Sequence, residues 1–368
     1  MKLQIAREDL LRGLSHVQAI VDRRGTLPIL TNALLEAHEG TLRMVATDLE
    51  VGVICTQAAE VTKAGRITLG AKKLYEIARE LDEGPVQIAT DTESRVAIEA
   101  ASSRFSLLSI SPEEYPTLPS AEGVEFSSFQ SSLLREMIDR TFYATSNDET
   151  RYNLNGILIE VTPEEQLCFV ATDGHRLAKI ERSAPTLPEA FRKGVIVPRK
   201  GVLEIRKLCD ESEGQVELAV SDGFLLIRRP DLQLSCRLID GEFPAYRQVL
   251  PQNQDVRLVV DRERLMHAIR RVSLVASERG GGFALTLHED QMQLAASNPD
   301  LGEAREHMAV EYSGPRFQTR YDPRYFLDAL QGTPSKEVVL ELIDDLSPAQ
   351  VRPTDDPDQL AVIMPMRL

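Results

Sequence analysis

Apolar positions near the N-terminus alternate first with the period of a strand and then with that of a helix. Leu3–Arg7 alternates between apolar and polar residues, which predicts a strand. From Leu10 to Val21 the apolar residues recur at i, i+1, i+4, i+7 and i+11, which places a single stripe on one helical face. Asp9, directly before this stripe, is the expected N-cap of the helix.

A hairpin, a second helix and further strands are predicted after this first helix. Pro28 ends regular helix, and the next two alternating segments meet at Glu39-Gly40, a pair typical of a hairpin turn. Lys72–Arg79 predicts a second helix, which closes at Gly84-Pro85. The strands expected in this first unit are residues 29–36, 41–47, 51–61, 86–89, 95–100 and 104–110.

The same order of strand, helix, hairpin and second helix is predicted twice more along the chain. In the second unit we expect strands at 124–129, 154–161 and 166–172, and helices at 133–142 and from Pro198 onward. In the third unit we expect strands at 256–260, 283–287, 291–296, 338–343, 351–352 and 360–364, and helices at 265–272 and 323–330.

A short phrase recurs at a fixed spacing in all three units. Val170–Leu177 contains the letters VATDGHRL, while Val45–Glu50 (VATDLE) lies 125 residues before it and Ala295–Asp300 (AASNPD) lies 125 residues after it. Related segments that recur in the same order and at the same spacing predict a repeated fold. We therefore expect an α+β protein of three tandem domains, each with two helices packed on antiparallel sheets, at residues 1–122, 123–253 and 254–368.

The bulk composition excludes several classes of protein. The chain has 368 residues, 42% of them hydrophobic, and contains neither a run long enough to span a membrane nor the apolar core of a signal peptide. The four cysteines are scattered, the six histidines show no ligand spacing, and a GxxxxGK[ST] phosphate loop is absent. We expect a reduced, soluble, cytoplasmic protein with no metal or other cofactor and no membrane partner.

The net charge of −15 is distributed unevenly. Basic and acidic residues nearly balance within the six predicted helical segments, so almost all of the negative charge lies outside them. Two explanations stay open from charge alone. The first is that Lys and Arg are common in helices because they have good helix propensity. The second is that the helices share a surface that faces a polyanion and contacts it only weakly. The chain has no Trp and few other aromatic residues, which disfavours base stacking on single strands.

The central phrase itself suggests catalysis, because Thr172, Asp173 and His175 could serve as a nucleophile and an acid/base pair. The other two copies favour a different interpretation. The first copy keeps Thr47-Asp48 and the third has Ser297-Asn298, so the shared part is a turn-forming pair. We therefore favour a structural turn on which the middle copy carries a binding surface. A hydrolase and a repeat scaffold without a nucleic-acid partner stay as the alternatives.

Several phrases match one known family. They are Val170–Leu177, Asn153-Leu154-Asn155-Gly156, Val197-Pro198-Arg199-Lys200-Gly201-Val202, Phe243-Pro244-Ala245-Tyr246 and the terminal Met364-Pro365-Met366-Arg367-Leu368. In these phrases, in its length and in its three units, the chain resembles the bacterial DNA sliding clamp, the β subunit of the replicative DNA polymerase III holoenzyme. The resemblance covers the whole chain.

The resemblance implies a head-to-tail homodimeric ring of six similar domains around duplex DNA, with helices lining the hole and sheets forming the rim. Such a ring holds DNA by topology, slides along it independently of sequence, and tethers a polymerase. It would be an accessory subunit without a catalytic site of its own. Its implied partners are the replicative polymerase catalytic subunit, an ATP-driven clamp loader, and other polymerases and repair proteins that bear short Gln/Leu/Phe motifs.

The resemblance also implies three sets of site residues. The partner-peptide pocket would comprise Leu154, Thr172, Gly174, His175, Arg176, Leu177, Pro244, Val249, Val362, Ile363, Met364, Pro365, Met366 and Arg367. The DNA contacts would be Arg24, Arg151, Tyr152, Arg199 and Lys200. The dimer contact would be made by Phe105, Leu107 and Leu108 on an edge strand and by Leu274 and Val275 on the other protomer. Gln248 stands where the family pattern has a basic residue, which puts a charge contact there in doubt but not the pocket.

Overall fold

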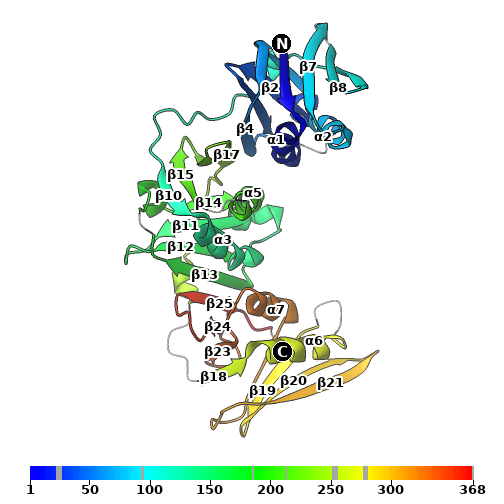
Figure 1. Cartoon of the computed structure of the whole chain (residues 1–368). Helices are drawn as coiled ribbons and strands as arrows, with labels where there is room; N and C mark the ends of the chain where they lie inside the picture. The colour runs from blue at the N-terminus through cyan, green and yellow to red at the C-terminus, as the bar shows by residue number, and fades with distance from the viewer. Residues whose placement is uncertain are drawn as a thin grey trace. The chain divides into compact units, whose positions relative to one another are not determined.

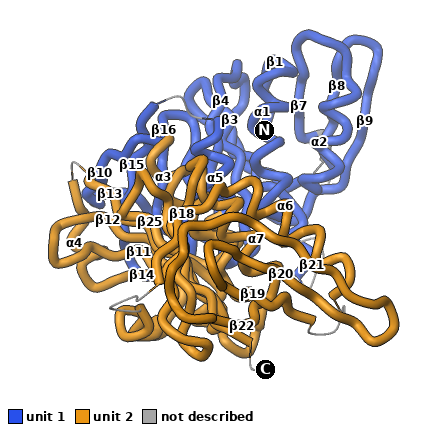
Figure 2. The backbone as a smooth tube through the Cα atoms, turned by 90° about the horizontal axis from the view of Figure 1, so that it is seen from below, with its two compact units in different colours: residues 1–131, 203–238 blue, residues 132–202, 239–368 orange. Residues whose placement is uncertain are grey.

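The computed structural model describes residues 1–21, 27–92, 95–184, 186–211, 214–250, 256–276 and 281–366, and it divides into two compact units (Figure 1 and Figure 2). Unit 1 comprises residues 1–131 and 203–238, and unit 2 comprises residues 132–202 and 239–368. The division cuts through the second predicted domain, because strand pairing joins each part of that domain to a neighbouring repeat.

Unit 1 holds two antiparallel sheets, two complete helices and, from Leu203 onward, most of a third helix, α5 (Arg199–Asp210). The first sheet has the order β5 (Glu60–Lys63), β1 (Lys2–Ala6), β7 (Pro85–Thr92), β8 (Arg95–Ala100) and β9 (Ser103–Leu108). The second has the order β10 (Ser127–Gln130), β15 (Gln215–Ser221), β16 (Phe224–Arg229), β17 (Leu232–Arg237), β4 (Val51–Ala58), β3 (Thr41–Thr47), β2 (Asn32–His38) and β6 (Gly65–Gly70). The complete helices are α1 (Arg7–Ile20) and α2 (Ala71–Glu80), with short 3₁₀ turns at η1 (Pro28–Thr31) and η2 (Pro112–Glu114).

Unit 2 repeats this plan. Its larger sheet has the order β14 (Val195–Pro198), β11 (Gly156–Val161), β12 (Leu167–Thr172), β13 (Arg176–Arg182), β25 (Gln359–Ile363), β24 (Ala349–Pro353), β23 (Glu337–Leu342) and β18 (Val256–Asp261). Its smaller sheet has the order β21 (Gly302–Ala309), β20 (Gln291–Asn298), β19 (Phe283–His288) and β22 (Phe317–Tyr321). The remaining helical segments are α3 (Ser131–Asp139), η3 (Phe142–Ala144), η4 (Glu149–Leu154), α4 (Glu189–Arg192), α5 (Arg199–Asp210), η5 (Tyr246–Val249), α6 (Arg262–Ser273) and α7 (Pro323–Gln331).

Both eight-stranded sheets cross a predicted domain boundary. In unit 1, β17 pairs with β4, so that Leu232 lies opposite Cys55. In unit 2, β13 pairs with β25, so that Leu177 lies opposite Val362. Neighbouring repeats are thus joined through backbone hydrogen bonds within a sheet. The predicted domain limits stay a prediction.

The helical stripes form the cores as expected. In α1, Leu10, Leu14, Val17 and Ile20 are buried, and in α6 the buried set includes Leu265, Met266, Ile269 and Val272. Among the described residues, none of the helices combines the length and the apolar character that a membrane crossing requires.

Some sequence-based limits were wrong. Helix α1 begins at Arg7, so its N-cap is Ala6 and Asp9 lies in the first turn. Arg7 takes the helical position because its Nε donates to the carbonyl of Ala78 at 3.0 Å, which fixes it against the end of α2. Helix α3 ends at Asp139, and the Thr141 hydroxyl then bonds the carbonyl of Met137 at 2.7 Å.

His16 provides a test of the packing of α1. Its side chain is only 16% exposed and its Nε2 lies 3.5 Å from Glu211, with Arg229 also bonded to that carboxylate. Burial lowers the pKa of His16, because it outweighs the nearby Glu211 carboxylate, which acts to raise that pKa. A lowered pKa in the folded state means that protons favour the unfolded chain, so stability should fall as pH drops below about 6.5. The His16→Gln variant should lose less stability between pH 7.5 and 5.5 in urea titrations, and an unchanged pH slope would contradict the assignment.

Candidate functional site

The central phrase forms a three-residue turn between β12 and β13. The Thr172 hydroxyl donates to the carbonyl of Arg176 at 2.6 Å, and Asp173 Oδ1 accepts the N–H groups of His175 and Arg176 at 2.9 and 3.0 Å. The first repeat makes the same bonds, from Thr47 to Val51 and from Glu50 and Val51 to Asp48. This confirms that the shared Thr-Asp pair is a turn motif.

The residue after the Thr-Asp pair adopts a left-handed conformation in both copies. Gly174 has φ of +88°, and Leu49 at the matching position of the first repeat has φ of +77°. The third repeat has Pro299 there, whose ring excludes positive φ. Its strand accordingly continues to Asn298, whose side chain accepts the N–H of Asp300 at 2.9 Å.

These bonds disfavour the hydrolase interpretation. The Thr172 hydroxyl donates to a backbone carbonyl, while Asp173 Oδ2 accepts Arg176 Nε at 3.0 Å. The ring of His175 stacks on Tyr325, with 6.0 Å between the ring centroids. The groups that acid/base chemistry would need are thus held in structural contacts.

Arg176 connects this turn to α7. Its Nη1 lies 2.5 Å from Asp328 Oδ2, and its guanidinium lies over the rings of Tyr325 and Tyr143, 4.8 and 5.6 Å from their centroids. With two carboxylates and two aromatic faces around it, the side chain is only 12% exposed. Arg176 therefore orders the turn, and Asp328, Tyr325 and Tyr143 are site residues that the sequence analysis missed.

The turn and the chain terminus lie side by side. Arg176 pairs with Ile363 and Leu177 with Val362 in the β13–β25 ladder, and the N–H of Met364 donates to the carbonyl of His175 at 2.9 Å. Leu177 and Val362 pack in one apolar cluster with Leu158, Cys168, Val170, Ile196, Tyr246 and Leu360, flanked by Phe243 and Leu250. Residues far apart in sequence thus share one surface.

We call this region the partner surface; it comprises the described residues predicted for the pocket. Val249 and Met364 are large apolar side chains that stay 53% and 40% exposed. The buried members are Leu154, Thr172, Leu177, Val362 and Ile363. Gly174, His175 and Pro244 are exposed, and Arg176, Pro365 and Met366 are half-buried. Arg367 lies outside the described residues.

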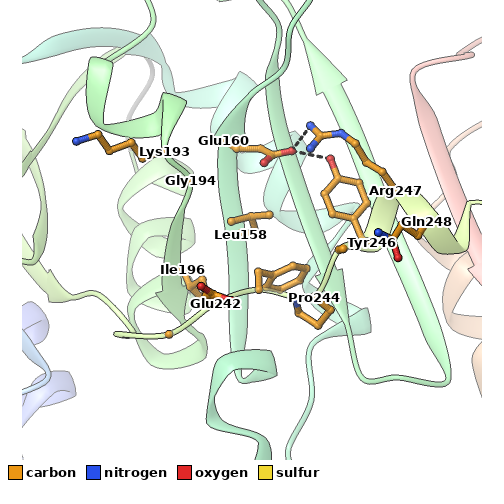
Figure 3. A pocket seen from close by; sticks show the side chains of 13 residues that line it. Leu158, Glu160, Lys193, Gly194, Ile196, Glu242, Pro244, Tyr246, Arg247 and Gln248 are labelled. Carbon is orange, nitrogen blue, oxygen red and sulfur yellow. Dashed lines mark hydrogen bonds and ion pairs between the residues drawn. The ribbon is translucent and has the colours of Figure 1, made fainter.

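A cavity of about 450 Å³ lies beside the partner surface (Figure 3). We call it the Glu160 cavity; its lining is Leu158, Glu160, Lys193, Gly194, Ile196, Gly241, Glu242, Phe243, Pro244, Ala245, Tyr246, Arg247 and Gln248. Glu160 Oε1 accepts the Tyr246 hydroxyl at 2.6 Å and Arg247 Nη2 at 2.5 Å. Burial raises the pKa of Tyr246 above its usual range, so the hydroxyl stays protonated and donates.

The residues predicted to contact DNA differ in the exposure of their side chains and in the contacts that these side chains already make. The side chains of Arg151 and Tyr152 are about half exposed, although Arg151 also lies 3.5 Å from Asp148. Arg199 lies over the ring of Phe142 and donates to Thr145, and burial lowers its pKa. It therefore has a clear structural role at the start of α5. Lys200 is half-buried, and Arg24 lies outside the described residues.

The predicted dimer contacts lie at exposed places. Strand β9 is an edge strand of its sheet, with Phe105 and Leu107 half-buried on one face and Leu108 69% exposed at its end. Directly after α6, Leu274 is 80% exposed and Val275 is half-buried. The sequence analysis missed β21, which is an edge strand of the smaller sheet of unit 2.

Within the described part of the chain, no three His, Cys, Asp or Glu side chains gather in the manner of a metal site.

Comparison with known proteins covers the whole chain. In sequence it matches the N-terminal domain of the DNA polymerase III beta subunit over residues 1–119, the central domain over 128–245 and the C-terminal domain over 247–367. A beta sliding clamp of Pseudomonas putida is 36% identical over 370 residues, and one of Escherichia coli is 35% identical over 371 residues. Both alignments span 100% of this chain and of the relative.

Solved structures give the same result. The DNA polymerase III subunit beta from Pseudomonas aeruginosa superposes with a TM-score of 0.94 at 36% identity, covering 100% of both chains. A sliding clamp from the same organism, solved bound to griselimycin, superposes with a TM-score of 0.93 at 36% identity over the full length of both chains.

Proposed function

We infer that this chain, which belongs to the DNA polymerase III beta subunit family of sliding clamps, is a DNA polymerase processivity factor. The observation that carries this is the full-length match across all three repeats, at 35–36% identity to named sliding clamps. The chain would work as an accessory subunit in the cytoplasm without a catalytic site of its own. The hydrolase and the scaffold without DNA are not favoured by these relatives.

The assembly that we propose is a closed homodimeric ring around duplex DNA. A ring holds its DNA by linkage, so its phosphate contacts stay weak and it slides without falling off. The balanced charge of the predicted helical segments suits a lining of this kind. Arg151, Tyr152 and Lys200 would contact the duplex, together with Arg24, while Arg199 would contribute through its position at the start of α5. A polymerase tethered to the ring gains effective concentration at the primer end.

The test of linkage is retention on DNA of different topology. After loading by an ATP-driven clamp loader, the protein should stay on nicked circular DNA and leave the same DNA once it is linearised. Gel filtration of labelled protein with each DNA measures the difference, which we expect to exceed about tenfold because contact binding alone is weak in physiological salt. Equal retention on both DNAs would mean contact binding and would refute the ring.

The two protomers would join edge to edge. An unpaired edge strand such as β9 can continue a sheet into a second copy, and β21 offers the other edge. Leu108 and Leu274, exposed in one chain, would then be buried.

The protein should therefore be a dimer at micromolar concentration in light scattering, and a monomer there would contradict the model. The Leu274→Asp variant should weaken the dimer about tenfold or more, since it places a charge in an apolar contact. Leu346→Asp is the matched control, because Leu346 is 72% exposed outside the predicted contact. An equal shift in both variants would mean a general effect of added charge.

The partner surface would bind tails of polymerases, of the clamp loader and of repair proteins through their Gln and Leu/Phe anchors. Two flexible methionines, Met364 and Met366, suit a site that admits different sequences. The exposed apolar side chains of Val249 and Met364 support such a role, because they stay uncovered in the chain alone. The relative solved with griselimycin further supports a ligand site in this family.

A further inference from the structure

The Glu160 cavity continues the partner surface. Pro244 belongs to both, and Gln248 lines the cavity directly before Val249 of the partner surface. Leu158 and Ile196, which line the cavity, pack in the same apolar cluster as Leu177 and Val362. A tail bound at the partner surface would therefore reach the cavity with its next few residues. A volume of about 450 Å³ exceeds what one bound water or a buried methyl group needs.

One carboxylate oxygen in the cavity lacks a donor. Both contacts to Glu160, from Tyr246 and Arg247, reach Oε1, and within the described residues Oε2 has no hydrogen-bond partner (Figure 3). The side chain of Glu160 is only 15% exposed, so water reaches this oxygen only in part. Oε2 is not among the fully buried side-chain atoms without a partner, so it keeps contact with water, and a ligand N–H group can replace that water with a hydrogen bond.

The rest of the lining suits a long basic side chain. Phe243, Leu158 and Ile196 offer apolar contact for an aliphatic stem, as Lys and Arg stems commonly find in proteins. At the rim, the exposed carboxylate of Glu242 has no ion pair within the described part of the chain. Lys193 is the one lining cation besides Arg247, and Arg247 is already paired with Glu160. The overall charge of −15 also favours basic partners.

We propose that the Glu160 cavity is a second subsite for partner tails and that it takes a Lys or Arg residue flanking their Gln/Leu/Phe motif. The stem packs on Phe243 and Leu158, and the cationic head bonds Glu160 Oε2. The carboxylate of Glu242, which Figure 3 shows at the other end of the cavity, adds a longer-range attraction. This inference rests on the proposed binding of partner tails at the neighbouring surface. The residues that flank the motif would then help the protein to distinguish between partner tails that carry the same motif.

The test compares labelled peptides by fluorescence anisotropy. One peptide carries the motif alone, and the others add a four-residue flank on either side with a single Lys, norleucine or Glu. The Lys peptide should bind about 3- to 10-fold more tightly than the motif alone, because a half-buried ion pair is added. The double variant Glu160→Gln/Glu242→Gln should remove this gain and leave the affinity of the motif peptide within about twofold.

The single variant Glu242→Gln should fold normally, because the side chain of Glu242 is exposed. It should remove part of the gain in affinity that the Lys peptide shows. Glu164→Gln, an exposed acid in the β11–β12 turn, is the matched control and should keep the whole gain. The subsite would be refuted if the Lys peptide kept its gain in affinity on the double variant. It would also be refuted if the norleucine or Glu peptide bound as tightly as the Lys peptide. If the motif peptide itself fails to bind, the proposed function falls, and the subsite falls with it.

Discussion

A chain that lacks Met364–Leu368 is expected to lose more than about 100-fold in affinity for a partner peptide, since central contacts of an interface carry most of its binding energy. The N–H of Met364 bonds the carbonyl of His175, and the N–H of Met366 bonds the carbonyl of Arg320 at 2.7 Å. The terminus is thus held at the turn that the middle repeat has modified. Its removal takes away the thioether side chains and the backbone hydrogen bond from Met364 to His175.

Fluorescence anisotropy with a motif peptide measures the loss. Strand β25 ends at Ile363, so its pairing with β13 and β24 survives the truncation, and the particle mass measured by light scattering should not change. Leu346→Ser serves as a control for removal of an exposed apolar side chain elsewhere. Peptide affinity within about threefold of the full chain would refute the assignment of the terminus to the pocket.

The Asp356→Ala variant is expected to lower the free energy of unfolding by about 2–4 kcal/mol, because it removes one of the two carboxylates that Arg140 and Arg182 share. Arg140 Nη1 lies 2.8 Å from Asp356, and Arg182 bonds the same carboxylate. Glu136 alone would then face both guanidinium groups, at 3.0 and 2.7 Å. Since these arginines and Asp356 are only 17–19% exposed, solvent screens the charges weakly.

Urea titration of the protein and of its variants measures this effect. The exposed pair of Arg305 and Glu303 is the matched control: both side chains are more than half exposed, and Glu303→Ala should change stability by about 0.5 kcal/mol or less. A loss of the same small size in Asp356→Ala would show that the network contributes no more than a surface pair.

The repeated architecture could be predicted because hydrophobic periodicity and turn chemistry are local. The strand at Thr41–Thr47 and the helix α7 fall where the pattern places them, within a residue. The misses have local causes as well. Strand β21 (GEAREHMA) carries charges at an edge and lacks the alternation of a half-buried strand. Helix α1 begins before its expected cap because Arg7 is fixed by the end of α2, a contact that no sequence window contains.

The site was predictable only in part for a similar reason. The resemblance supplied the partner surface, but Asp328 lies 152 residues from Arg176, and neither the repeat nor the motif connects them. The Glu160 cavity depends on three segments that meet through the β11–β14 pairing and the loop at residues 241–248. Side chains brought together by sheet register leave no periodic signal in the sequence.

The Thr-Asp turn has a consequence for protein engineering. Its geometry is set by the Thr and Asp side chains, which bond the backbone of the turn, while the residues after this pair differ between the copies, as Leu49-Glu50 and Gly174-His175 show. Leu49 adopts the same left-handed backbone as Gly174, so the first repeat forms this turn without a glycine. The first repeat therefore contains a ready graft point, where a foreign recognition loop can be displayed between β3 and β4 without redesign of the scaffold.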